Sequence, residues 1–142
     1  MARHTLRGTI DSSEVRRLII DDGNFAQGHK VVSFEIFPVD MTSGSNDVSG
    51  VLSIDYDGAR QEWLAEDSRQ IGWSSTTMST SNSVNNKTDI IDPDHIVIRD
   101  LYVTAYSNSG RINYLVIVEP VSLSEDEVVL QLIKERSQDD SR

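Results

Sequence analysis

The chain has 142 residues, with 23 acidic and 13 basic side chains and a formal net charge of -10. This length predicts one domain with a core of reasonable size. The acidic balance argues against a nucleic-acid partner, because a nucleic-acid-binding surface needs a basic patch that neutralises phosphates. The lack of Cys in the sequence excludes disulfides and thiol chemistry.

No apolar run in the sequence approaches the roughly 18 residues that a membrane-spanning helix needs. The first residues also lack the apolar segment of a secretory signal. We therefore expect a soluble protein with no membrane partner.

The first half of the chain predicts short strands separated by polar turns. Branched and aromatic residues alternate with polar ones, as in half-buried strands. The predicted strands are residues 5–10, 15–21, 30–39, 48–56 and 69–75. A short helix starting at Ser13 is the alternative for the second segment, because Glu14 and the two arginines after it are good helix formers.

Two features between the fourth and fifth predicted strands could carry function. Asp55 to Gly58 resembles part of a calcium loop but lacks the remaining ligand positions, so we interpret it as a strand end followed by a turn. Trp63 is expected to anchor the charged segment 61–67, because burying an indole contributes up to about 3 kcal/mol.

Residues 74–88 consist almost entirely of Ser, Thr and Asn. Such a stretch cannot bury enough surface to form its own core. Its beginning can continue the preceding strand, and residues 82–87 are predicted to form a mobile or partner-facing tip. We take Asn82, Asn85 and Asn86 as partner-contact candidates.

Residues 91–121 are the most apolar part of the chain. They predict a central hairpin, with strands over 95–106 and 112–118 and a Gly-containing loop over 107–111. The second strand is apolar on both faces, which predicts a position inside a sheet.

The first strand of this hairpin changes its alternation near Arg99, which predicts a β-bulge. The alternative is a regular strand with Leu101 and Val103 on one face and Tyr102 and Tyr106 on the other. The pattern alone does not decide between them.

Candidate catalytic and metal ligands are sparse. Asp92, Asp94 and His95 could bind a metal, but no further ligand follows at a suitable spacing, so we predict a turn followed by a solvated histidine. His4 and His29 lie far from His95 in the sequence, and no nucleophile motif accompanies them. We predict no catalytic, cofactor or metal site and a non-enzymatic protein. A hydrolase with two carboxylates brought together by folding is the enzymatic alternative.

The end of the chain predicts an α-helix over roughly 125–136. Ser124 and Glu127 have the spacing of a capping box. A helix of about 12 residues is marginal alone in water, so its apolar stripe must dock on its own sheet or on a neighbouring subunit. The contact candidates on this stripe are Val128, Leu132 and Ile133.

Together these elements predict a mainly β fold, an antiparallel β-sandwich or jelly-roll-like module with one C-terminal α-helix. Residues 1–122 form the predicted sandwich domain. Residues 123–142 form the helix and a polar tail, either in the same domain or docked on a partner.

Several stretches carry a resemblance: RLIIDDGNF, RQIGWSS, IDPDHIVIRDLYV, INYLVIVEPV and LQLIKERSQDD. Over most of its length the chain resembles small virion structural proteins of marine tailed bacteriophages. The resemblance implies a protein made in the host cytoplasm and assembled into the virion, as a capsid decoration or minor head protein. Its expected partners are copies of itself, in a homo-oligomer, and other capsid or tail proteins. It carries over no catalytic residues.

A tail-associated, receptor- or glycan-binding module is the alternative function. In that case the 74–88 segment would form a platform with Trp63, Trp73 or Tyr106. Core packing is the more common role of such aromatic side chains.

Overall fold

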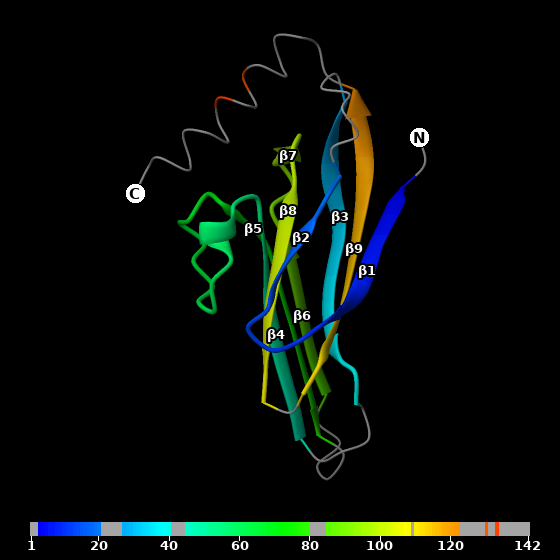
Figure 1. Ribbon diagram of the computed structural model, residues 1–142, viewed down its shortest axis with the longest axis vertical. Helices are drawn as coiled ribbons and strands as arrows, with labels where there is room; N and C mark the ends of the chain where they lie inside the picture. Colours follow the sequence, from blue (N-terminus) through cyan, green and yellow to red (C-terminus); the bar gives the residue numbers. More distant parts are fainter. Residues whose placement is uncertain are drawn as a thin grey trace.

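The computed structural model describes residues 3–20, 27–40, 45–79, 85–108 and 110–122, and also Leu130 and Ile133. Within these residues nine strands form two antiparallel sheets (Figure 1). The first sheet has the order β1 (His4–Ile10), β9 (Ile112–Ser122), β3 (Gln27–Pro38), β7 (Ile96–Val97). The second has the order β2 (Val15–Leu18), β8 (Leu101–Ser107), β4 (Ser45–Ser53), β5 (Gln70–Ser79), β6 (Asn85–Ile91).

The two sheets face each other across a shared apolar core. Phe34 and Val116 come from the first sheet, Leu52 and Val103 come from the second, and all four side chains are fully buried. The prediction of a mainly β, antiparallel fold is confirmed, and the arrangement is compatible with a β-sandwich. The strand order does not establish a jelly roll.

Most predicted strands are present, with shifted ends. Residues 15–18 form β2, so the helical alternative there is wrong. β3 and β4 each begin three residues before the predicted start, and β4 ends at Ser53. Pairing with a neighbouring strand extends these strands into polar residues that alternation alone does not identify.

The predicted central hairpin is wrong, because its two strands belong to different sheets. β8 pairs with β2 and β4, whereas β9 pairs with β1 and β3. The position of β9 inside a sheet is confirmed. The segment between them therefore crosses from one sheet to the other, a gap of about 10 Å that a short connection can span. Gly110 serves this crossing with a φ of 135°, a conformation that other residues rarely adopt.

The predicted bulge near Arg99 is also wrong. β7 pairs with β3 in the first sheet, and β8 begins the next segment in the second sheet. The alternation changes because the chain faces the same core first from one sheet and then from the other. Within β8 the alternative is confirmed, since Leu101 and Val103 are buried while Tyr102 and Tyr106 are half-buried.

The predicted C-terminal helix is not among the elements of the described part, which include no α-helix. Most of its span, with Val128 and Leu132, lies outside the described residues. Leu130 and Ile133 are described and have helical backbone, yet they expose 61% and 54% of their surface. Of the two alternatives for this stripe, docking on the chain's own sheet or on a neighbouring subunit, the exposure of Ile133 does not support the first. Without such packing a helix of about 12 residues gains little stability.

The described parts of the Ser- and Thr-rich segment, residues 74–79 and 85–88, belong to strands. Its beginning continues β5, as predicted, and Asn85 to Thr88 belong to β6, so the predicted tip is corrected there. The inward hydroxyls have a defined role: the Ile36 N–H donates to Ser74 Oγ at 3.0 Å, and Thr76 Oγ1 donates to the Ile36 carbonyl at 2.6 Å. On this side of β3 the two-residue β7 pairs only with His29 and Lys30, so it does not reach Ile36. The two hydroxyls therefore bond the β3 backbone at a position that β7 does not cover.

Three smaller predictions are also decided. Asp57 N–H donates to Asp55 Oδ1, and Asp94 N–H donates to Asp92 Oδ1, which confirms both turns. His95, directly before β7, is buried and not solvated as predicted. Trp63 is 38% exposed, so the predicted anchoring by burial is wrong.

Candidate interaction surface

β6 has the most exposed residues of the strands in the second sheet. β6 is the last strand in its sheet, and no described strand pairs with its outer side. All of its residues are exposed except Ile91, which is half-buried, and Ile90 exposes 49% of its surface. Unpaired edge strands of this length are sites at which other chains add strands.

An apolar groove lies beside the N-terminal half of this edge. The groove has a volume of about 320 Å³. A second hollow of similar size, about 370 Å³, lies at the opposite end of the molecule. The groove beside β6 is lined by Phe37, Thr76, Thr77, Met78, Asn85, Asn86 and Lys87. Phe37 reaches it from β3, so the groove spans both sheets.

The charged groups of the edge form a local network on the inner face of β6. Lys87 Nζ lies 3.3 Å from Asp89 Oδ1 and 3.8 Å from Glu35 Oε1. Asp89 Oδ1 also accepts a hydrogen bond from Ser74 Oγ at 2.6 Å. The three charged side chains remain about a third exposed, so a partner could still reach them.

The predicted contact residues are placed in part. Asn85 and Asn86 lie together at the groove, on a strand and not on the predicted loop. Asn82, like Val128 and Leu132, lies outside the described residues. The sequence reasoning missed Phe37 and Met78. The signal was present, since Met78 is one of two apolar residues in a polar stretch.

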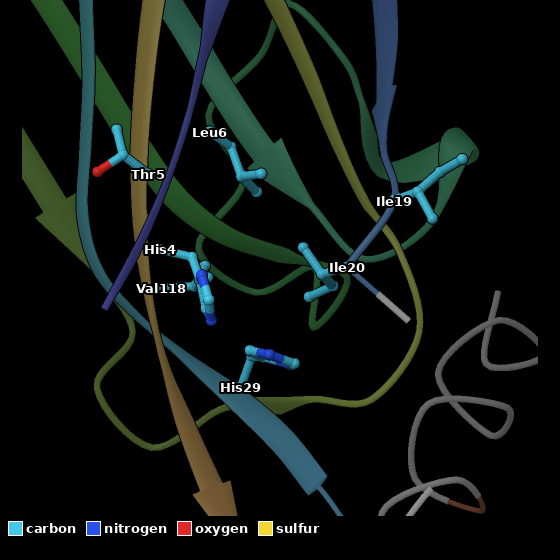
Figure 2. Close-up of a pocket in the computed structure, with 7 residues that line it drawn as sticks. All are labelled: His4, Thr5, Leu6, Ile19, Ile20, His29 and Val118. Atoms are coloured by element: carbon cyan, nitrogen blue, oxygen red, sulfur yellow. The ribbon is translucent and has the colours of Figure 1, made fainter. Parts of the chain in front are cut away.

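The other hollow lies between the start of β1 and the end of β2 (Figure 2). His4 and His29 both face it, although they are far apart in the sequence, and Ile19 and Ile20 line its other side. Among the described residues no three His, Asp or Glu side chains come together as a metal site. This hollow therefore offers two imidazoles and an apolar wall.

A third hollow, of about 140 Å³, lies beside a pair of tyrosines. Asp55, Asp100 and Tyr102 are among its lining residues, and Tyr56 meets Tyr102 edge-to-face with ring centroids 6.2 Å apart. Arg17 Nε donates to Asp100 Oδ2 at 2.6 Å, and this bond raises the pKa of Arg17. Tyr56 is 61% exposed. Aromatic faces beside carboxylates are a common setting for sugar recognition.

Trp73 and Tyr106 are more buried than the third aromatic candidate, Trp63. Trp73 is half-buried, and its Nε1 donates to Gln70 Oε1 at 2.9 Å. Tyr106 is half-buried on the outer face of β8. Neither lies as open to solvent as Tyr56.

The fold and the edge define a mainly β protein of two antiparallel sheets, in which the edge strand β6 lies beside an apolar groove. No family model, curated protein or solved structure matches the chain. In the part of the chain that the structure describes, no helix has the length and apolar character to cross a membrane.

Proposed function

We propose that this chain is a non-enzymatic structural protein of a tailed-bacteriophage virion, associated with the capsid as a decoration or minor head protein. The observation that carries the proposal is the exposed β6 edge beside the apolar groove of Phe37 and Met78. The resemblance to virion proteins gives the setting, and the edge gives a means of contact.

The edge suits assembly for a physical reason. An added strand forms main-chain hydrogen bonds along β6, and a neighbouring apolar groove adds side-chain specificity. Subunits repeated on a shell need such a contact at the same place on each copy. The exposed Leu130 and Ile133 add a second apolar contact from residues 123–142. The partners are copies of this chain and other capsid or tail proteins, and the location is the virion, after synthesis in the host cytoplasm.

The test is quantitative mass spectrometry and cryo-electron microscopy of phage particles purified from the infected host. We expect the protein in many copies per particle, with density on the capsid that repeats with its symmetry. Its absence from particles that contain their other structural proteins would overturn the proposal.

The exposed Tyr56 beside the half-buried Tyr102 favours one second candidate, a tail-associated receptor- or glycan-binding module. Tyr56 would stack on a sugar ring while Asp55 and Asp100 accept hydrogen bonds from its hydroxyl groups. A glycan array compares the natural protein with Tyr56→Ala and with Tyr106→Ala as control. Binding lost only in Tyr56→Ala supports this candidate, and no binding by the natural protein removes it.

A further inference from the structure

We propose that β6 pairs with β6 of a second copy of this chain, antiparallel and about a two-fold axis at Thr88, so that two five-stranded sheets become one. This inference names the partner at the edge and rests on the proposed assembly function for its biological role. It is carried by backbone direction and charge, which together select a single register.

The backbone direction follows from one hydrogen bond at the end of the strand. Asp92 N–H donates to the Ile71 carbonyl at 2.8 Å, one step beyond the pair Gly72 and Ile91. Along an antiparallel strand, residues alternate between bonding one neighbour and bonding the other. The residues of β6 that direct N–H and C=O groups toward the open edge are therefore Asn85, Lys87, Asp89 and Ile91.

In an antiparallel self-pairing, the residues whose N–H and C=O groups point to the open edge must lie opposite each other. Few registers satisfy this condition. A two-fold axis at Lys87 would set two lysines face to face, and an axis at Asp89 would set two carboxylates face to face. An axis at Thr88 sets Lys87 of each copy opposite Asp89 of the other, twice. Opposite charges at facing positions stabilise a strand pair and like charges destabilise it. Charge thus selects the axis at Thr88.

This register also uses the apolar groups at the edge. Asn85 of one copy lies opposite Ile91 of the other, next to the groove that Phe37 and Met78 line. On the outer face Ile90, which is half exposed, lies opposite Asn86 of the partner. The pairing gives both isoleucines a neighbour that the single chain lacks at its edge.

The other sheet edges do not offer the same match. β1 carries Arg7 and no acidic residue, so no register gives it a complementary self-pairing. β2 has four residues, and two of them are arginines. β7 has two residues. Among the edges of the described sheets, β6 combines length, exposure and self-complementary charge.

The lack of cysteine makes a direct test of the register simple. In Thr88→Cys the two thiols face each other at the axis, where opposed Cβ atoms lie about 4.5–5.5 Å apart, so mild oxidation should yield a disulfide-linked dimer after small adjustment. Asn86→Cys alone should remain uncoupled, because its two copies are separated by about 13 Å along the strands. Ile90→Cys alone should also remain uncoupled. An equimolar mixture of Asn86→Cys and Ile90→Cys should cross-link, because residue 86 of one copy lies opposite residue 90 of the other.

Charge reversal tests the same register without a covalent bond. Lys87→Asp and Asp89→Lys should each weaken self-association about tenfold or more, as measured by sedimentation equilibrium. Mixing the two variants should restore the dimer, because each reversed residue then meets an opposite charge. Thermal unfolding of each variant shows whether it is folded before its association is compared.

The inference is overturned if the natural protein stays monomeric up to about 1 mM, or if all three single-cysteine variants cross-link equally well. A dimer with this register that is missing from virions would overturn the capsid role and leave the pairing standing. Protein that is bound to the capsid but does not show the cross-link pattern would overturn the β6 pairing and leave the capsid role standing.

Discussion

Thr76→Val should destabilise the protein more than Thr77→Val, although both remove one hydroxyl from neighbouring positions of β5. Thr76 is buried and donates to the Ile36 carbonyl, whereas Thr77 alternates to the outer face of the sheet. Valine has nearly the shape of threonine, so the comparison isolates the hydrogen bond.

The expected loss of stability in Thr76→Val follows from the buried Ile36 carbonyl. Removing the donor leaves a buried acceptor without this bond, which costs about 1–2 kcal/mol. Ser74→Ala should cost about 2–3 kcal/mol, because the Ile36 N–H loses its acceptor and Asp89 loses a donor. Thr77→Val and Ser75→Ala should stay within about 0.5 kcal/mol of the natural protein.

The assay is urea unfolding at pH 7, in which stability changes shift the midpoint at constant slope. Thermal unfolding should show a drop of about 3–4 °C per kcal/mol for a chain of this size. If Thr76→Val and Thr77→Val differ by less than about 0.5 kcal/mol, the β5 hydroxyls do not support the edge of β3, and our account of the Ser- and Thr-rich segment is wrong.

Three further changes test other parts of the fold. Gln70→Leu should lower stability by about 2–3 kcal/mol and speed proteolysis near Trp63, because the buried Gln70 amide bonds several backbone groups of this loop. Ser13→Gly should raise the free energy of unfolding by up to about 1 kcal/mol, and the melting temperature slightly with it, since Ser13 has a φ of 72°. Glu14→Gln should cost less than about 1 kcal/mol at pH 7. Backbone and Arg16 hydrogen bonds lower the Glu14 pKa in the folded state, so this contribution is present above the unfolded pKa and is lost as the pH falls through the folded one. Stability curves of the two proteins should converge as the pH falls below the folded-state pKa of Glu14, and a constant gap would contradict the assignment.

The candidate surface was predictable only in part. Asn85 and Asn86 were singled out as polar residues at a loop tip, and they do lie at the surface that we propose for contact. They are exposed because they belong to an edge strand, and not because they lie at a loop tip. Phe37 joins the same groove from β3, and no local pattern links it to residues about 50 positions later in the chain.

The sequence by itself determined that the fold is mainly β and where most of its strands lie. In residues 30–39 the alternation of apolar and polar residues matches the structure, since Phe34 and Ile36 are fully buried and Glu35 between them is half-buried. It also determined the turns at Asp55 and Asp92. These features depend on residues two to four positions apart, and local geometry is enough to decide them.

Only the tertiary structure decided which sheet each strand joins. A buried face is satisfied equally well from either side of a two-layer core, so alternation could not show that β8 and β9 lie in opposite sheets. That choice depends on pairs far apart in the chain, such as Gly8 with Tyr114. The same holds for Ser74 and Thr76, whose hydroxyls are polar by sequence and become buried because the edge of β3 lies above them.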